Sequence, residues 1–117
     1  MTTLIEDLQA LLNPLASGGS WYGVNTAQPA TFPYIVFSRV VSVPNVSLRG
    51  PSDLQNTRVQ IDIFSRGIAE AVSIEAALEA AMNAWAVINL PLSGFDLFED
   101  EIRAYRVSKD YSIWAVN

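Results

Sequence analysis

The sequence predicts an α+β fold, because it mixes segments with helical periodicity and segments with strand character. Leucines recur at helical spacing near the N-terminus, and a long alanine-rich segment later in the chain is also helical in pattern. Three other segments are rich in β-branched and aromatic residues. The 117 residues are enough to bury a core without disulfides or metal, so we expect a single domain over residues 1–117.

The first expected element is an amphipathic helix over residues 3–13. Its leucines fall within a narrow arc of the helical wheel, while the polar residues lie elsewhere. Thr3 and Glu6 have the spacing of a capping box, in which the hydroxyl and the carboxylate each accept a hydrogen bond from a free backbone N–H. Pro14 is expected to end the helix, because it has no N–H to donate.

Two long strands are expected next, over residues 34–43 and 57–65. The first follows Pro33 and is apolar on both faces, so neither face is plainly solvent-facing. The second alternates cleanly, which predicts one buried side and one side in contact with water. Before them, Trp21–Val24 (WYGV) fits either an edge strand or an aromatic plug over the core, and the sequence leaves both interpretations open.

A long loop is expected between these strands, over Pro44–Asn56, where Gly, Pro, Ser, Asp and Asn interrupt the strand pattern. Hairpin connections usually have about two to five residues, and much longer ones tend to be functional or mobile. Val46, Leu48 and Arg49 place an apolar pair and a cation near its tip. We interpret the segment as a contact loop that becomes ordered on assembly; the alternative is an inert, disordered insertion.

The main helix is expected over Gly67–Ala86, with Ser65 as its N-cap. One side of this helix carries the larger apolar residues, and a second strip consists of alanines that include Ala76 and Ala80. A strip of small side chains lets another backbone approach closely, so it is a candidate packing surface. The alternative is that alanine is there for helix propensity alone.

After the main helix we expect a loop around Pro91 and Gly94, an acidic segment over Phe95–Glu101 and a long final strand over Tyr105–Val116. The four acids of the acidic segment lack the spacing of a calcium-binding EF-hand loop. We therefore expect a solvated acidic turn and no metal site.

The composition excludes several classes of function. The chain has neither Cys nor His, so it lacks zinc-finger ligands, Cys–His and Ser–His catalytic pairs, and an imidazole that titrates near neutral pH. It contains no G-x-S-x-G elbow, P-loop or G-x-G-x-x-G motif, and we expect neither an enzyme nor a cofactor. A net charge of −5 with seven scattered basic residues argues against nucleic-acid binding. No stretch is long and apolar enough to predict a membrane span.

Charged residues make up only 16% of the chain, whereas about 25% is typical. Some apolar surface is therefore expected to be covered by a partner. We assign that surface to three places: the strand over residues 34–43, the alanine strip, and the loop tip around Leu48.

Three segments, 33–37 (PYIVF), 59–65 (VQIDIFS) and 110–114 (DYSIW), combine with the order helix, strand, loop, strand, helix, strand. Together they resemble the small tail completion, or tail terminator, proteins of long-tailed bacteriophages and prophages. The resemblance covers nearly the whole chain. It implies a mostly antiparallel sheet of about four to five strands, with the two main helices packed on one face.

The resemblance also implies a structural virion protein that caps the head-proximal end of the tail tube. Such a protein stops tube polymerisation and forms the surface that joins the neck and head. Its partners would be copies of itself, commonly in a six-membered ring, the tail-tube protein, and a neck or head-completion protein. It would be assembled in the cytoplasm of the bacterial host and reside in the tail or neck of the virion.

Two alternatives to this function stay open. The first is a neck or head-closure adaptor of the same assembly. The second, from a different class, is a small-ligand-binding α+β domain in which Trp21, Tyr22, Trp85 and Trp114 line a pocket. The simpler interpretation of these aromatic residues is that they fill the core.

Overall fold

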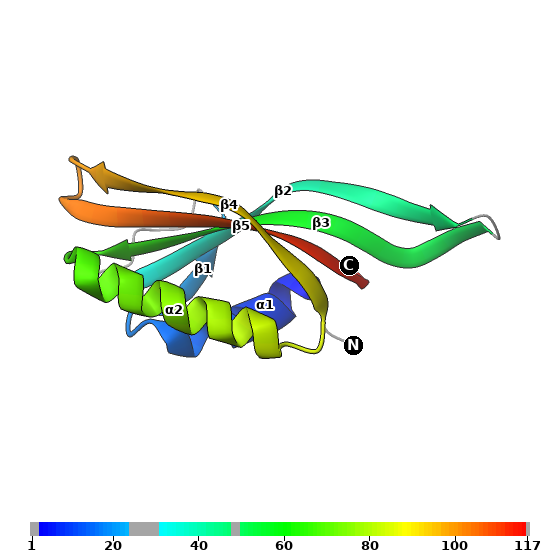
Figure 1. Cartoon of the computed structure of the whole chain (residues 1–117), viewed down its shortest axis with the longest axis horizontal. Helices are drawn as coiled ribbons and strands as arrows, with labels where there is room; N and C mark the ends of the chain where they lie inside the picture. The colour runs from blue at the N-terminus through cyan, green and yellow to red at the C-terminus, as the bar shows by residue number, and fades with distance from the viewer. Residues whose placement is uncertain (1–2, 24–30, 48–49, 117) are drawn as a thin grey trace.

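The computed structural model describes residues 3–23, 31–47 and 50–116, with side chains described outside 41–55 and 116. The elements in chain order are α1 (Leu4–Leu12), the 3-10 turn η1 (Asn13–Leu15), β1 (Ser20–Tyr22), β2 (Tyr34–Ser47), β3 (Gly50–Ser65), α2 (Ile68–Ala84), β4 (Ile88–Glu99) and β5 (Ala104–Val116). The strands form one sheet in the order β1-β2-β3-β5-β4, antiparallel except for the β1–β2 pair. Both helices lie on one face of the sheet (Figure 1). The predicted α+β class is confirmed.

The helix α1 begins as predicted. The backbone N–H of Glu6 donates to the Thr3 hydroxyl over 3.2 Å, and the backbone N–H of Thr3 donates to the Glu6 carboxylate over 3.1 Å, which completes the capping box. Its leucines at positions 4, 8 and 12 are buried, and Pro14 lies in the 3-10 turn that follows the helix. The apolar arc of α1 therefore faces the sheet.

The core lies between the sheet and the two helices. Alternate residues of β2, β3 and β5 point toward the helices, because side chains of a strand alternate between its two faces. The buried side chains of this layer include Ile35, Phe37, Val59, Ile61, Ile63, Val107, Tyr111 and Ile113 from the sheet, and Leu4, Leu8, Leu12, Ala71, Ile74, Leu78 and Met82 from the helices. The helix α1 contacts β1, and α2 contacts β3 and β5. Neither helix packs extensively against β4.

The loop predicted over Pro44–Asn56 is wrong, because β2 and β3 continue through most of it as a paired hairpin. Val43 pairs with Asn56, and the ladder runs outward to Ser47 opposite Gly50. The register shifts between Pro44 and Val46, where a bulge accommodates a residue that cannot donate to the ladder. This hairpin arm, residues 41–47 and 50–55, projects beyond the helices (Figure 1) and lengthens the molecule to 51 × 26 × 23 Å.

The N-cap predicted for the main helix is also wrong. Gly67, not Ser65, occupies the N-cap position of α2. The Ser65 hydroxyl instead accepts a hydrogen bond from the backbone N–H of Gly67 over 3.2 Å and donates to the carboxylate of Glu70 over 2.6 Å. Ser65 therefore fixes the turn before the helix from two residues before the N-cap.

The largest error in the sequence-based expectations concerns β4. We expected a loop around Pro91 and Gly94 and then an acidic turn, but one strand runs from Ile88 to Glu99 through both residues. A register shift between Pro91 and Gly94 marks a bulge at which the strand passes the two residues that disfavour regular pairing. Pairing with β5 provides the hydrogen bonds that a local sequence pattern cannot reveal.

At the opposite end of the sheet, Trp21 and Tyr22 belong to the short edge strand β1, so the edge-strand interpretation of this segment is correct. Both side chains remain more than a third exposed. The strand Tyr34–Val43 was assigned surplus apolar surface, but its first residues are covered by the chain itself. Tyr34 is only 2% exposed and stacks on Phe64 with ring centroids 5.0 Å apart.

We predict that Leu78→Ala lowers the free energy of unfolding by about 2–5 kcal/mol, because Leu78 is fully buried between α2 and the sheet. Val72→Ala on the same helix is the matched control, since Val72 is 48% exposed and its loss should cost about 0.5 kcal/mol or less. Urea denaturation followed by circular dichroism measures both. Equal losses for the two variants would contradict the packing described for α2.

Candidate assembly surfaces

The residues predicted for the loop contact lie on or next to the hairpin arm. Val46 belongs to β2 and pairs with Pro51 of β3, close to the tip of the arm. Its side chain, and residues Leu48 and Arg49 as a whole, lie outside the described residues. What the structure adds is the support, since the tip is carried on a two-stranded arm that extends beyond both helices (Figure 1).

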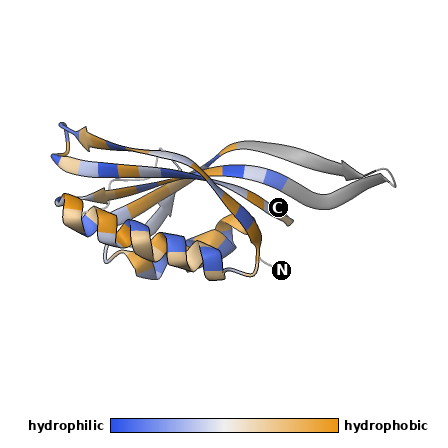
Figure 2. Cartoon of the chain, viewed as in Figure 1, coloured by the Kyte–Doolittle hydropathy of each residue, from blue (hydrophilic) through white to orange (hydrophobic). Residues whose placement is uncertain are grey.

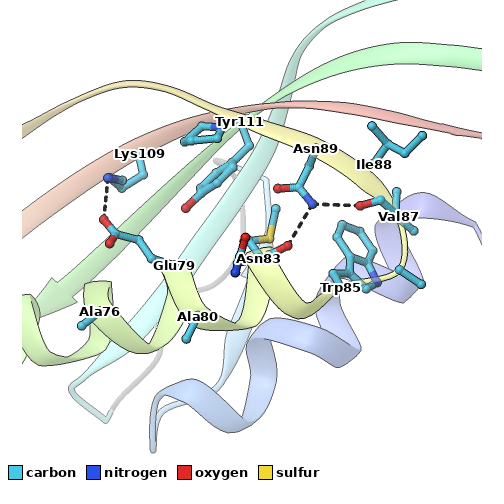
Figure 3. A pocket seen from close by; sticks show the side chains of 13 residues that line it. Ala76, Glu79, Ala80, Asn83, Trp85, Val87, Ile88, Asn89, Lys109 and Tyr111 are labelled. Atoms are coloured by element: carbon cyan, nitrogen blue, oxygen red, sulfur yellow. Dashed lines mark hydrogen bonds and ion pairs between the residues drawn. The ribbon is translucent and has the colours of Figure 1, made fainter.

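The other two predicted residues, Ala76 and Ala80, lie together on the wall of a groove. This α2–β4 groove has a volume of about 820 Å³ and runs between the second half of α2, the beginning of β4 and the middle of β5 (Figure 3). Both alanines are exposed. The groove exists because α2 packs beneath β3 and β5 and leaves the adjoining part of β4 uncovered.

Hydrogen bonds hold the two walls of the groove in place. The side-chain amide of Asn89 on β4 donates to the carbonyl oxygens of Met82 (3.0 Å) and Val87 (2.9 Å), which ties the start of β4 to the end of α2. Farther along, the Lys109 ammonium on β5 donates to the carboxylate of Glu79 over 2.9 Å. Figure 3 shows this pair bridging from β5 to α2.

The charges in the groove do not favour acid–base chemistry at neutral pH. The hydrogen bond to Glu79 raises the pKa of Lys109, against the opposing effect of burial. Burial raises the pKa of the neighbouring Tyr111 hydroxyl as well. Lys109 is therefore held as a cation and Tyr111 as a neutral phenol. The groove offers a packing and hydrogen-bonding surface.

The aromatic residues proposed to line a ligand pocket do not gather in this groove. Trp85, which is partly buried, is one of its lining residues. Trp21 and Tyr22 lie on β1 at the far edge of the sheet. Trp114 lies on β5, between Asn56 of β3 and Ile88 of β4. The groove thus lacks the aromatic lining expected of that small-ligand site.

The strand β4 carries the most prominent apolar surface of the described residues. Six of its large apolar residues are between 42% and 67% exposed: Ile88, Leu90, Leu92, Phe95, Leu97 and Phe98. From the pairing with β5, four of them lie on the face of the sheet opposite the helices: Ile88, Leu90, Phe95 and Leu97. We call these four residues the β4 strip. Contiguous apolar surface of this kind marks interaction sites in soluble proteins.

The helix-free face beside the β4 strip is polar and held by ion pairs. Arg106 on β5 contacts Asp62 on β3 (3.0 Å) and Glu99 on β4 (3.2 Å), and so links three strands. Arg58 on β3 contacts Asp110 on β5 over 2.7 Å. Asp62, expected to face water, is only 7% exposed, because Arg106 and Gln60 cover it. Both guanidinium groups on this face are therefore paired with carboxylates.

The β4 strip was not predicted, although the sequence contains a signal for it. Apolar residues alternate before the Ser93–Gly94 pair and again after it, with the period of two that is typical of strands. Pro91 and Gly94 were taken as the centre of a loop, and the bulge between them hid the continuity of the two halves.

Within residues 3–23, 31–47 and 50–116, no helix is long and apolar enough to cross a membrane. Within the same ranges, no three acidic side chains gather closely enough to hold a metal ion.

We predict that Gly94→Ala destabilises the β4–β5 pair by about 1–3 kcal/mol. A Cβ atom at this position would lie 2.5 Å from the carbonyl oxygen of Ser108, so the bulge must open to admit it. Ser93→Ala, at the neighbouring exposed position, is the control and should leave stability within about 0.5 kcal/mol of the unchanged protein. Chemical denaturation measures the free energy of unfolding of both variants. An unchanged value for Gly94→Ala would show that the close approach of Gly94 to the Ser108 carbonyl does not require glycine.

Comparisons with known proteins agree with this architecture. The family model described as tail completion protein gp17 matches residues 6–115. A chain in a solved structure of the virion of a native gene transfer agent (GTA) particle has a similar fold, with a TM-score of 0.65 and 15% sequence identity; the similarity covers 90% of this chain and 84% of that chain. None of the curated proteins compared with it matches. The match over nearly the whole chain shows that this protein belongs to the tail completion protein gp17 family, a structural family of phage tails.

Proposed function

We propose that this protein caps the head-proximal end of a phage tail tube as a ring of identical subunits, stops the polymerisation of the tube and forms the joining surface to the neck and head. The observation that carries the proposal is the family match over residues 6–115. In this proposal the role is structural and not enzymatic. The number of subunits in the ring, six, is taken from the resemblance to the family. We take residues 1–117 as a single tail-terminator-like domain.

The two different edges of the sheet support a ring. β4 lies at one edge and β1 at the other, so an edge-to-edge contact between copies joins unlike surfaces. Such a heterologous contact closes into a ring when the rotation from one copy to the next divides a full turn. One side of such a ring can bind the end of the tube. The opposite side of the ring then remains available to the neck.

The hairpin arm and the α2–β4 groove supply the remaining candidate contacts. The arm, which includes Val46 and is interrupted in sequence by Leu48 and Arg49, extends beyond the helices and can reach a neighbour or the tube (Figure 1). Ala76 and Ala80 leave room in the groove for an approaching backbone. Charge on the chain is −5, which disfavours strong attachment to DNA that passes through a ring.

Deletion of the gene tests the proposed role directly. Because uncapped tubes would continue to grow, we predict overlong tails in electron micrographs of phage particles that lack this protein, with normal length restored when the gene is supplied in trans. Tails of normal length that fail to attach to heads would instead identify a neck or head-closure adaptor.

A strict monomer would also contradict the proposal. Light scattering after size exclusion, over a range of concentrations and with added tail-tube protein, measures the oligomeric state. A chain that never associates and binds neither tube nor neck protein does not cap a tail.

We further predict that replacing Leu48 and Arg49 with Ser leaves folding intact and impairs assembly of the tail, because the residues on either side of them, Ser47 and Gly50, belong to the arm that projects beyond the helices (Figure 1). Thermal unfolding and tail completion are measured on the same variant. The control is Val72→Ser on the exposed side of α2, which should leave both unchanged. Normal completion with the altered arm would remove the arm tip from the set of contacts.

A further inference from the structure

One row of paired residues crosses the whole sheet and ends in an exposed aromatic residue on each side. Trp21 on β1 pairs with Val36, Val36 with Asp62, Asp62 with Ser108, and Ser108 with Phe95 on β4. Residues that pair directly lie on the same face of a sheet, so Trp21 and Phe95 both belong to the helix-free face. Trp21 is 39% exposed and Phe95 is 50% exposed.

The apolar surface at the β4 edge is large enough to form much of an interface. Aromatic side chains present about 150–250 Å² each, so the six exposed apolar residues of β4 together leave on the order of 500 Å² uncovered. A standard protein interface buries about 800 Å² on each partner. The β4 edge therefore supplies more than half of what a specific contact requires, before the groove is counted.

The strand directions allow the sheet to continue from one copy into the next. β4 runs antiparallel to β5, β5 to β3, and β3 to β2, so β4 runs opposite to β2 and to its parallel neighbour β1. In a ring whose axis follows the strands, each copy keeps the same strand direction. The β4 edge of one copy then meets the β1–β2 edge of the next in antiparallel orientation, the more stable of the two pairings.

We propose that Phe95 of one copy packs against Trp21 of a second copy, so that the β4 edge of the first and the β1 edge of the second form the contact between neighbouring subunits. This inference rests on the proposed ring and names the surface that builds it. Pro91, which has no N–H to donate, and the bulge before Gly94 interrupt the earlier half of β4, so pairing of its outer edge with a second copy is expected over Phe95–Glu99. The contact thereby has a defined register, and free edges are protected from indiscriminate pairing.

Cross-linking tests the contact, and the absence of native cysteine makes introduced thiols unique. The variant that carries both Trp21→Cys and Phe95→Cys is treated with a short bismaleimide at a concentration where the protein is oligomeric. We expect a ladder of trimers and larger species on a denaturing gel, because each copy links to a different neighbour on each side. The control pair Val72→Cys and Phe95→Cys, with one thiol on the exposed side of α2, should give no ladder.

Four results would overturn the proposal. Phe95→Cys alone giving dimers in high yield would show that two β4 edges meet each other. A thiol at position 95 that links to tail-tube protein and not to a second copy would assign the β4 strip to the tube. An intact oligomer without a ladder would place the contact elsewhere while leaving the proposed function in force, whereas a chain that stays monomeric and binds no tail protein would remove both.

Charge substitution provides a second measurement on the same surface. Phe95→Asp should weaken self-association by about tenfold or more, as expected for an aromatic anchor at the centre of a contact. Val72→Asp introduces the same charge at a residue of similar exposure and should leave association unchanged. Thermal unfolding confirms that both variants fold. Equal association of the two variants overturns the role of Phe95.

Discussion

An α-helix with its side chains is about 10–12 Å wide, and neighbouring strands of a sheet are about 4.7–4.9 Å apart, so one helix covers two strands. This sheet has five strands and two helices on one face. With α1 against β1 and α2 against β3 and β5, no helix is left to cover β4. The groove that opens between β4 and α2 follows from this shortage of cover. The β4 strip is exposed for a different reason, which is that it lies on the face of the sheet that carries no helix (Figure 2).

The low charge of the chain has a structural counterpart. Among the basic residues whose side chains the structure describes, Arg58, Arg106 and Lys109 form ion pairs, and they hold the middle of the sheet and one end of the groove. Charged residues are already few in this chain, and these ion pairs further reduce the number of unpaired charges at the surface. A partner that approaches along β4 therefore meets apolar side chains, whose burial is favourable at roughly 25 cal/mol per Å².

Local signals in the sequence predicted the elements that local chemistry determines. The capping box of Thr3 and Glu6 predicted the start of α1, and period-two alternation over residues 57–65 identified the second half of β3. Both segments that were wrongly predicted as loops have the same explanation. Their own residues disfavour a strand, but pairing with a neighbouring strand provides hydrogen bonds for their backbone. Pro44 in β2 and Pro91 in β4 both lie at register shifts, where a missing N–H is tolerated.

Ala76 and Ala80 were identified as a candidate surface from their small size, but the groove that they line depends on β4. The row that joins Trp21 to Phe95 depends on strand order, which no local pattern contains.

The central claim is that β4 is left uncovered within one copy and becomes covered on assembly. Hydrogen–deuterium exchange measured on the dilute protein and on assembled tails tests it most directly, since the outer backbone N–H groups of an edge strand exchange freely until another strand pairs with them. We predict strong protection of residues 95–99 and of β1 on assembly, with little change in the buried part of α2. Equal exchange of residues 95–99 in both states, with protection appearing elsewhere, would contradict the account.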